Sequence, residues 1–190
     1  MFEVELKARL NTGQIEEIEK VLKSTYKCSS EICVYQDTYF DTVSRDLDEN
    51  ERELRLRKTV TGQSKTVLLT YKEPPFDSIS KSKPEHEILV NSHEQAAIIL
   101  GHLGYVADIS FQKHCTNFQV GYRSMGILVT LVRMKELNED FIEVEVQTAE
   151  AEMITEIIDC LHEFLVLLNV MPEQLTTEYY TEMVRQVRNQ

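Results

Sequence analysis

Charged and apolar side chains alternate along several short segments of this chain. Every second residue of segment 2–9 is charged, from Glu3 to Arg9, and the residues between them are apolar. Residues 53–57 and 142–145 repeat the alternation. Because successive side chains of a β-strand point to opposite faces, each segment predicts a strand with one charged and one aliphatic face. The fold must either expose the charged faces to water or turn them toward one another around a charged lumen.

The bulk properties are those of an ordinary globular protein. The 190 residues suit one sizeable domain, expected to span 1–190, and a hydrophobic content of 42% with 27% charged residues gives no sign of disorder. The net charge of −12 argues against a nucleic-acid partner and against an anionic membrane surface. No apolar run approaches the roughly 20 residues of a membrane span. Four scattered cysteines without a C-x-x-C pattern favour a reducing, cytoplasmic location.

The order of the predicted elements favours an α+β fold. Strands and helices do not alternate as in parallel α/β proteins, so we expect a closed eight-stranded antiparallel β-barrel with a polar lumen. About four helices should cover its apolar exterior. Loops are predicted at 42–50 and 74–82. The predicted strands are 2–10, 31–41, 51–60, 65–73, 85–90, 109–120, 125–135 and 140–148, and the predicted helices begin at 11 or 12, 92, 149 and 172 and end near 27, 104, 169 and 187.

Basic side chains occur on the charged faces of five or six predicted strands. If these faces meet in one lumen, the cations repel one another strongly unless an anion lies among them. Arginine offers paired hydrogen bonds to phosphate oxygens, and lysine offers a point charge. The alternative is that each side chain lies on a solvated face of a sheet. The candidate polyanion-binding residues are Lys7, Arg55, Arg57, Lys72, Lys83 and Lys113.

Three E-x-E pairs each place two carboxylates on one face of a strand. Such carboxylates can share a hard divalent cation, Mg²⁺ or Mn²⁺, which also binds phosphate oxygens. Alternatively, some of them form only ion pairs with the basic residues. Acids and bases together in one barrel indicate a metal–polyphosphate site rather than a carboxylate-dyad hydrolase. The residues are Glu3, Glu5, Glu85, Glu87, Glu143 and Glu145.

Other catalytic signatures are missing from the sequence. It contains no G-x-x-x-x-G-K-[ST] phosphate loop, no G-x-G-x-x-G and no G-x-S-x-G. His114 is an isolated candidate base, and a lone histidine is more often structural or exposed. The Tyr179-Tyr180 pair on the last predicted helix is more typical of packing than of chemistry. The charged strand faces therefore remain the main functional signal.

Taken in order, these segments resemble the CYTH, or triphosphate tunnel metalloenzyme, superfamily, and most closely its class IV adenylyl cyclase-like group. The hallmark is the E-x-E-x-K motif formed by Glu3, Glu5 and Lys7. The similarity continues over nearly the whole chain, which makes it far more specific than the motif alone. The other matching segments are 36–41, 53–57, 69–72, 83–87, 141–145 and 180–184.

The resemblance implies an eight-stranded antiparallel tunnel that binds triphosphate with basic side chains and a divalent metal, Mg²⁺ or Mn²⁺, with acidic ones. The implied ligand is a nucleoside triphosphate or inorganic polyphosphate, the implied activity is that of an adenylyl cyclase or a triphosphatase, and a homodimer is expected by analogy. By position, the resemblance assigns phosphate binding to Lys7, Arg55, Arg57, Lys72 and Lys113, metal binding to Glu3, Glu5, Glu143 and Glu145, and tunnel lining to Glu85 and Glu87. The residues implied to be catalytic are Glu3, Glu5, Lys7 and Glu143.

Two positions depart from the family pattern. The family usually has an acidic residue in a Leu-Asp step before the last E-x-E, and this chain has Val132 there. The family's basic run around Lys113 ends in Arg, and this chain has Cys115 instead. Losing a metal-side carboxylate is expected to weaken one ion, to change the metal, or to stop turnover while binding persists. The alternative function is therefore a nucleotide- or polyphosphate-binding module with weak or no catalysis.

Overall fold

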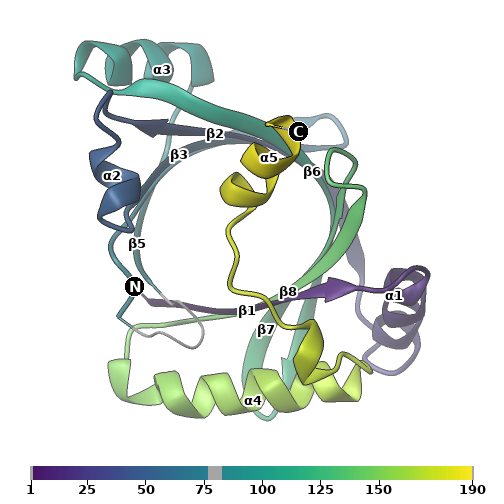
Figure 1. Ribbon diagram of the computed structural model, residues 1–190. Helices are drawn as coiled ribbons and strands as arrows, with labels where there is room; N and C mark the ends of the chain where they lie inside the picture. The colour runs from purple at the N-terminus through teal and green to yellow at the C-terminus, as the bar shows by residue number, and fades with distance from the viewer. Residues whose placement is uncertain (1, 77–82, 190) are drawn as a thin grey trace.

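The computed structural model describes residues 2–76 and 83–189, and its eight strands form the closed antiparallel barrel expected from the sequence (Figure 1). Around the barrel the strands follow the order β1-β5-β4-β3-β2-β6-β7-β8, and β8 closes onto β1. The strands are β1 (Phe2–Leu10), β2 (Ser30–Asp41), β3 (Glu53–Thr61), β4 (Ser64–Lys72), β5 (Lys83–Leu89), β6 (Val106–Tyr122), β7 (Met125–Met134) and β8 (Glu139–Thr148).

The two seams of β1 differ in length. It pairs with β8 along its whole length, from Phe2 to Leu10, whereas among the described residues only Phe2 and Glu3 pair with β5. Strand β5 begins at Lys83, two residues before the predicted strand. Residues 77–82 of the predicted loop 74–82 lie outside the described residues. The part of the β1–β5 seam that the structure describes has two paired positions, and side-chain contacts across it add to closure.

The exterior of the barrel is apolar and lies under helices, as the alternation predicted. Val4, Leu6 and Ala8 of β1 face outward and are buried. They pack with Ile18 of α1 (Gln14–Ser24) and Leu161 of α4 (Ile154–Leu167) in one large hydrophobic cluster. Figure 1 shows α4 lying along the barrel beneath β1, β7 and β8. Because apolar burial stabilises by about 25 cal/mol per Å², these helices make an inside-out barrel stable in water.

A second apolar cluster forms under α3 (His93–His102), on the opposite side of the barrel. Ala96 and Leu100 of this helix pack in one cluster with Leu54 and Leu56 of β3. Ser92 caps this helix, because its hydroxyl accepts a hydrogen bond of 3.2 Å from the backbone N–H of Gln95. Helices thus cover two regions of the outer face of the barrel, and the charged side chains line the lumen.

A short helix occupies part of the segment predicted as the loop 42–50. It is α2, Asp46–Glu49. The carboxylate of Asp41 accepts hydrogen bonds from the backbone N–H groups of Leu47 and Asp48, at 2.9 and 3.0 Å, which satisfies donors that a helix start leaves unpaired. The loop prediction was wrong here because this cap lies five residues before the helix.

Two predicted helices are shorter than expected. Helix α1 begins at Gln14 rather than at residue 11 or 12, because Gly13 adopts a left-handed conformation with φ 83° just before it. The helix predicted over 149–169 begins as a 3₁₀ turn at Ala151–Met153 and becomes α4 only at Ile154. None of the helices in the described parts of the chain is long and apolar enough to cross a membrane.

The last helix was predicted to begin at Pro172, and this start is wrong. A 3₁₀ turn at Pro172–Gln174 is followed by an extended segment, and α5 spans Tyr180–Arg188. The extended segment is held to β1 by a β-bridge between Leu175 and Ala8. Backbone pairing with a strand is incompatible with a continuous helix. Figure 1 shows this segment and α5 crossing in front of the barrel opening.

We expect Phe164→Ala to lower the free energy of unfolding by about 3–5 kcal/mol, because it leaves a cavity in the cluster that closes the exterior. Phe164 is fully buried and contacts the rings of Tyr26 and Tyr122. Val166→Ala on the same helix is the matched control, because Val166 is 52% exposed. Urea denaturation measures both variants. Equal effects of the two substitutions would contradict this account of the exterior.

Candidate functional site

A polar cavity of about 150 Å³ lies in the lumen of the barrel. The structure brings all six predicted cations to its wall, together with four of the six predicted acids. Glu85 and Glu87 of β5 lie behind this wall, 3.7 and 3.9 Å from Arg55 Nη2. The basic residues that line it are Lys7, Arg55, Arg57, Lys72, Lys83 and Lys113, and the acidic ones are Glu3, Glu5, Glu53, Glu143 and Glu145.

Three carboxylates gather at the junction of β1 and β8. Glu5 lies directly opposite Glu145 in the strand register, and one carboxylate oxygen from each of Glu3, Glu5 and Glu145 lies within 4.8 Å of the others. Burial, then the charges of Glu143 and Glu3, raise the pKa of Glu5 to about 7. Burial and the charges of Glu3 and Glu5 raise the pKa of Glu145 to about 8. An all-oxygen set that resists full ionisation suits a hard divalent cation.

Lys72 of β4 connects this acidic group to β5. Its ammonium is hydrogen-bonded to Glu3 and lies 3.7 Å from Glu85. Burial would raise the pKa of Glu3, but the charge of Lys72 holds it well below its usual range. Burial and a hydrogen bond with Glu3 raise the pKa of Glu85 to about 9. The Lys72–Glu3 pair also bridges the short β1–β5 seam, because Lys72 lies on the strand beyond it.

Glu143 lies on the cationic side of the cavity. Lys113 Nζ donates to its carboxylate at 3.1 Å. Burial would raise the pKa of Glu143, but the charges of Lys113 and Lys7 lower it. The resemblance implied metal binding by Glu143, and in this structure, which carries no ligands, its carboxylate is paired with Lys113.

Two acids that the sequence reasoning did not select hold cations in place. Asp37 of β2 accepts two hydrogen bonds from Arg57, at 2.7 and 2.8 Å, and is 1% exposed. Burial would raise its pKa, but the charge of Arg57 holds it well below its usual range. Glu53 accepts a hydrogen bond of 2.7 Å from Lys83. The sequence signal that could have identified Asp37 is its position on the predicted strand 31–41, where it shares one face with Tyr35 and Tyr39. Both tyrosines line the cavity.

The segment before α5 contacts several lysines of the site. Lys7 Nζ donates to the backbone carbonyl of Glu178 at 2.5 Å, and burial lowers the pKa of Lys7. Lys83 Nζ lies 4.7 Å from the centre of the Tyr179 ring. The Tyr180 ring lies 4.4 Å from Lys7 Nζ and 4.6 Å from Lys113 Nζ. The tyrosine pair therefore does more than the packing expected from sequence.

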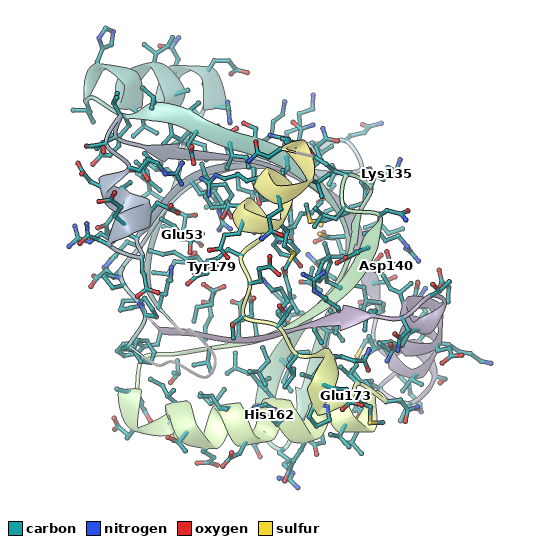
Figure 2. All side chains as sticks on the ribbon, viewed as in Figure 1. Glu53, Lys135, Asp140, His162, Glu173 and Tyr179 are labelled. Carbon is teal, nitrogen blue, oxygen red and sulfur yellow. The ribbon has the colours of Figure 1, made fainter. Side chains whose placement is uncertain are left out.

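Figure 2 shows how this segment reaches the barrel interior. Glu53 of β3 and Tyr179 both lie within the outline of the barrel, whereas Lys135 lies at its rim. Ring faces attract cations, so Tyr179 and Tyr180 stabilise lysines whose usual partner would be an anion. His114, the candidate base, points away from the lumen. Successive side chains of a strand alternate, and its neighbours Lys113 and Cys115 face inward.

The two departures from the family pattern lie opposite each other in the barrel. Cys115 of β6 is the register partner of Val132 of β7. Both are buried and belong to an apolar cluster with Phe111, Phe141 and Tyr180. At this level the wall of the tunnel is uncharged, and the first residue of α5 packs against it.

The family model described as "CYTH domain" matches residues 1–180. A protein of Methanocaldococcus jannaschii named "Putative adenylate cyclase MJ0240" is 24% identical over 183 residues, which cover 96% of this chain and 98% of that protein. The structure of PH1819 from Pyrococcus horikoshii OT3 superposes with a TM-score of 0.81 at 25% identity, over 97% of this chain and 98% of that one.

A more distant structure has the same fold. It is the "putative adenylyl cyclase HpAC1" of Hippeastrum, described as having a dominant triphosphatase activity. It superposes with a TM-score of 0.64 at 15% identity, over 98% of this chain and 96% of that one. At this identity the likeness shows the fold alone.

We expect Glu5→Gln to stabilise the metal-free protein at pH 8 by roughly 1–3 kcal/mol, since one pKa unit corresponds to about 1.4 kcal/mol. The pKa of Glu5 in the folded protein, about 7, exceeds the ordinary value of 4.5. Its ionisation therefore costs the folded state stability as the pH rises from about 5 to above 7. Glutamine resembles the protonated form, so the gain should be clearly smaller at pH 5.

Urea denaturation in EDTA at the two pH values measures this effect. Glu31→Gln is the control, because Glu31 is exposed on β2. A gain in Glu5→Gln that does not grow with pH would show that Glu5 does not carry the cost of buried charge assigned to it.

Proposed function

This chain belongs to the CYTH domain family, and we propose that its tunnel binds the triphosphate group of a nucleoside triphosphate or of inorganic tripolyphosphate together with a divalent cation. We propose that it converts this ligand as an adenylyl cyclase of the class IV kind or as a triphosphatase. The observation that carries the proposal is the convergence of six basic side chains from five strands, β1 among them, on one cavity beside an all-carboxylate cluster.

The pairing of the cations supports an anionic ligand. Lys72, Arg57, Lys83 and Lys113 each have a carboxylate partner, whereas Lys7 rests on a backbone carbonyl and a tyrosine ring. The buried Nε–H of Arg55 has no hydrogen-bond partner among the described residues. A buried donor without a partner costs about 1–3 kcal/mol, and a phosphate oxygen would remove that cost.

The balance of charge explains why a metal should accompany the anion. Six basic and five acidic side chains line the cavity, and Asp37 and Glu85 add two carboxylates behind them. These carboxyl groups offset much of the positive charge that a bare polyphosphate would otherwise meet. Glu3, Glu5 and Glu145 offer the oxygen ligands that Mg²⁺ or Mn²⁺ prefers. When bound, the cation supplies charge neutralisation at the phosphate oxygens and polarisation of the phosphoryl group.

The protein's own residues would orient the phosphates and stabilise the charge that develops during transfer. Arg55 and Arg57 offer planar pairs of donors, and Lys7, Lys72 and Lys113 act as point charges. In a triphosphatase, water attacks the terminal phosphorus and these groups stabilise the equatorial and leaving oxygens. In a cyclase, the ribose O3′ attacks the α-phosphorus and pyrophosphate leaves. The names of the Methanocaldococcus and Hippeastrum relatives support these two reactions.

One observation favours a second candidate, a module that binds triphosphate without converting it. The wall at Val132 and Cys115 is apolar and buried, so this part of the tunnel offers no metal ligand. The binding site described above does not depend on that level of the wall. Binding without turnover is the outcome that distinguishes the module from the enzymes.

We expect tripolyphosphate to raise the thermal stability of the protein in the presence of Mg²⁺ or Mn²⁺, and to do so less in EDTA. A ligand at about 100 times its Kd stabilises by about 2.7 kcal/mol.

Lys7→Ala should weaken binding about 10- to 100-fold, which corresponds to the 1.5–3 kcal/mol of a charged hydrogen bond. Lys135→Ala, at the barrel rim, is the control. Titration calorimetry measures all three proteins, and equal affinities in Lys7→Ala and wild type would remove Lys7 from the site.

We expect Glu143→Gln to abolish metal-dependent turnover while the fold persists, because Glu143 orients Lys113 and adds a buried negative charge to the site. Assays for phosphate, pyrophosphate and cyclic AMP with ATP and with tripolyphosphate identify the reaction. Circular dichroism checks the fold, and Glu31→Gln is the control. Wild-type turnover in Glu143→Gln would contradict its assignment, and tight binding with no product in the wild type would favour the binding module.

A further inference from the structure

Two of the four cysteines face each other on the inner wall of the barrel. Cys33 of β2 and Cys115 of β6 are direct register partners in an antiparallel pair of strands. Their strand neighbours on the same face, Tyr35 and Lys113, line the cavity. Each cysteine is 2% exposed, and both belong to the apolar cluster inside the barrel. Neither thiol has a role in the function proposed above.

The strand geometry suits a bond between them. Directly opposite residues of an antiparallel pair have Cα atoms about 4.5–5.5 Å apart, and disulfides span Cα distances of about 4.4–6.8 Å. Cβ atoms of such a pair, about 4.5–5.5 Å apart, need a small approach to reach the separation of about 3.5–4.5 Å that a disulfide requires. The backbone therefore already holds the two residues at bonding range.

The surroundings of the two thiols make them chemically different. The side-chain amide of Asn117 donates to Cys33 Sγ at 3.5 Å. The hydrogen bonds with Cys115 and Tyr35 outweigh burial and lower the pKa of Cys33 to about 7. The hydrogen bond with Cys33 and burial raise the pKa of Cys115. Because the thiolate is the reactive form, Cys33 is the nucleophile of the pair and Cys115 is the thiol that follows.

The other two cysteines lack this arrangement. Cys28 lies in the turn after α1, where its thiol donates to the carbonyl of Tyr26, and Cys160 is buried in α4 outside the barrel. Neither is opposite another cysteine in the strand register, since neither lies in a strand. They serve as internal references for the reactivity of an isolated cysteine in this fold.

We propose that Cys33 and Cys115 are an oxidation site of the tunnel wall, at which a small hydroperoxide forms a reversible disulfide. The Cys33 thiolate attacks the peroxide oxygen, the O–O bond breaks, and an alcohol or water leaves after taking up a proton. The Cys115 thiol then attacks the sulfur of the Cys33 sulfenic acid, so that the S–S bond forms and water leaves. Two thiols lose two electrons to one peroxide, and a dithiol reductant restores them.

The buried position selects the oxidant by size. Hydrogen peroxide is close to water in volume and can pass through the lumen, whereas bulkier oxidants and thiol reagents should reach thiols that are 2% exposed much more slowly. The bond would join β2 to β6 next to Tyr35 and Lys113. The wall of the cavity would therefore differ between the oxidised and the reduced protein. This inference rests on the two strands alone and does not depend on the proposed function.

The test uses the full chain carrying Cys28→Ser and Cys160→Ala, treated with hydrogen peroxide at pH 7.5 and digested without reduction. Mass spectrometry should find one peptide pair joined through Cys33 and Cys115, with two hydrogens lost, and dithiothreitol should restore both thiols. The melting temperature should rise on oxidation, because a cross-link between distant residues restricts the unfolded chain. Absence of the joined pair, or irreversible sulfinic acid at either position, would overturn the proposal.

Two further variants of this background test the order of the steps. With Cys115→Ser, oxidation should stop at a sulfenic acid on Cys33 that dimedone traps. With Cys33→Ser, the rate of peroxide consumption should fall at least tenfold. Circular dichroism checks both folds. Equal peroxide reactivity of the two variants would refute the assignment of Cys33 as the nucleophile, and if either variant fails to fold, the disulfide map of the background protein decides the proposal.

Discussion

Charge burial inside a closed ring of strands is the constraint on which this structure depends. The alternation in β1 puts Glu3 and Glu5 on the face opposite Val4 and Leu6, so closure must remove both faces from bulk water. The helices α1 and α4 cover the apolar face and remove it from water. For the charged face the solution is mutual pairing, because isolated charges of this kind would be costly to bury. The ion pair between Lys72 and Glu3 neutralises two buried charges and also spans the seam between β1 and β5, of which the structure describes two paired positions.

The two departures from the family pattern have one structural explanation rather than two. Val132 and Cys115 are cross-strand partners, so the acidic and the basic residue that the family usually has there would face each other. Replacing both leaves the net charge of the lumen unchanged. An apolar patch results, and Tyr180 packs on it while its ring contacts Lys7 and Lys113. The effect of Val132 on metal binding therefore stays a prediction that has to be considered together with its partner Cys115.

The alternation predicted the strands, the charged lumen and the six cations, because parity on a strand is a local property. It could not predict which acid pairs with which base. Asp37 pairs with Arg57 as register partners of β2 and β3, and Glu143 of β8 pairs with Lys113 of β6 past the intervening β7, which no single segment encodes. The predicted start of the last helix was wrong for the same reason, because the β-bridge between Leu175 and Ala8 joins residues from the two ends of the chain. The sequence thus predicted which residues line the candidate site, but not which acid pairs with which base.

Protons and metal ions are alternative ways to satisfy the same carboxylates. Glu5 and Glu145 have raised pKa values near neutrality because burial and neighbouring acids oppose their charge. The charge of Lys72 lowers these two pKa values only in part, since Lys72 is paired with Glu3, and Lys113 is paired with Glu143. A divalent cation between the three acids would replace the protons and free Lys72 to face an anion. Binding of cation and polyphosphate in one tunnel is therefore expected to be mutually supportive, because each removes the charge that opposes the other.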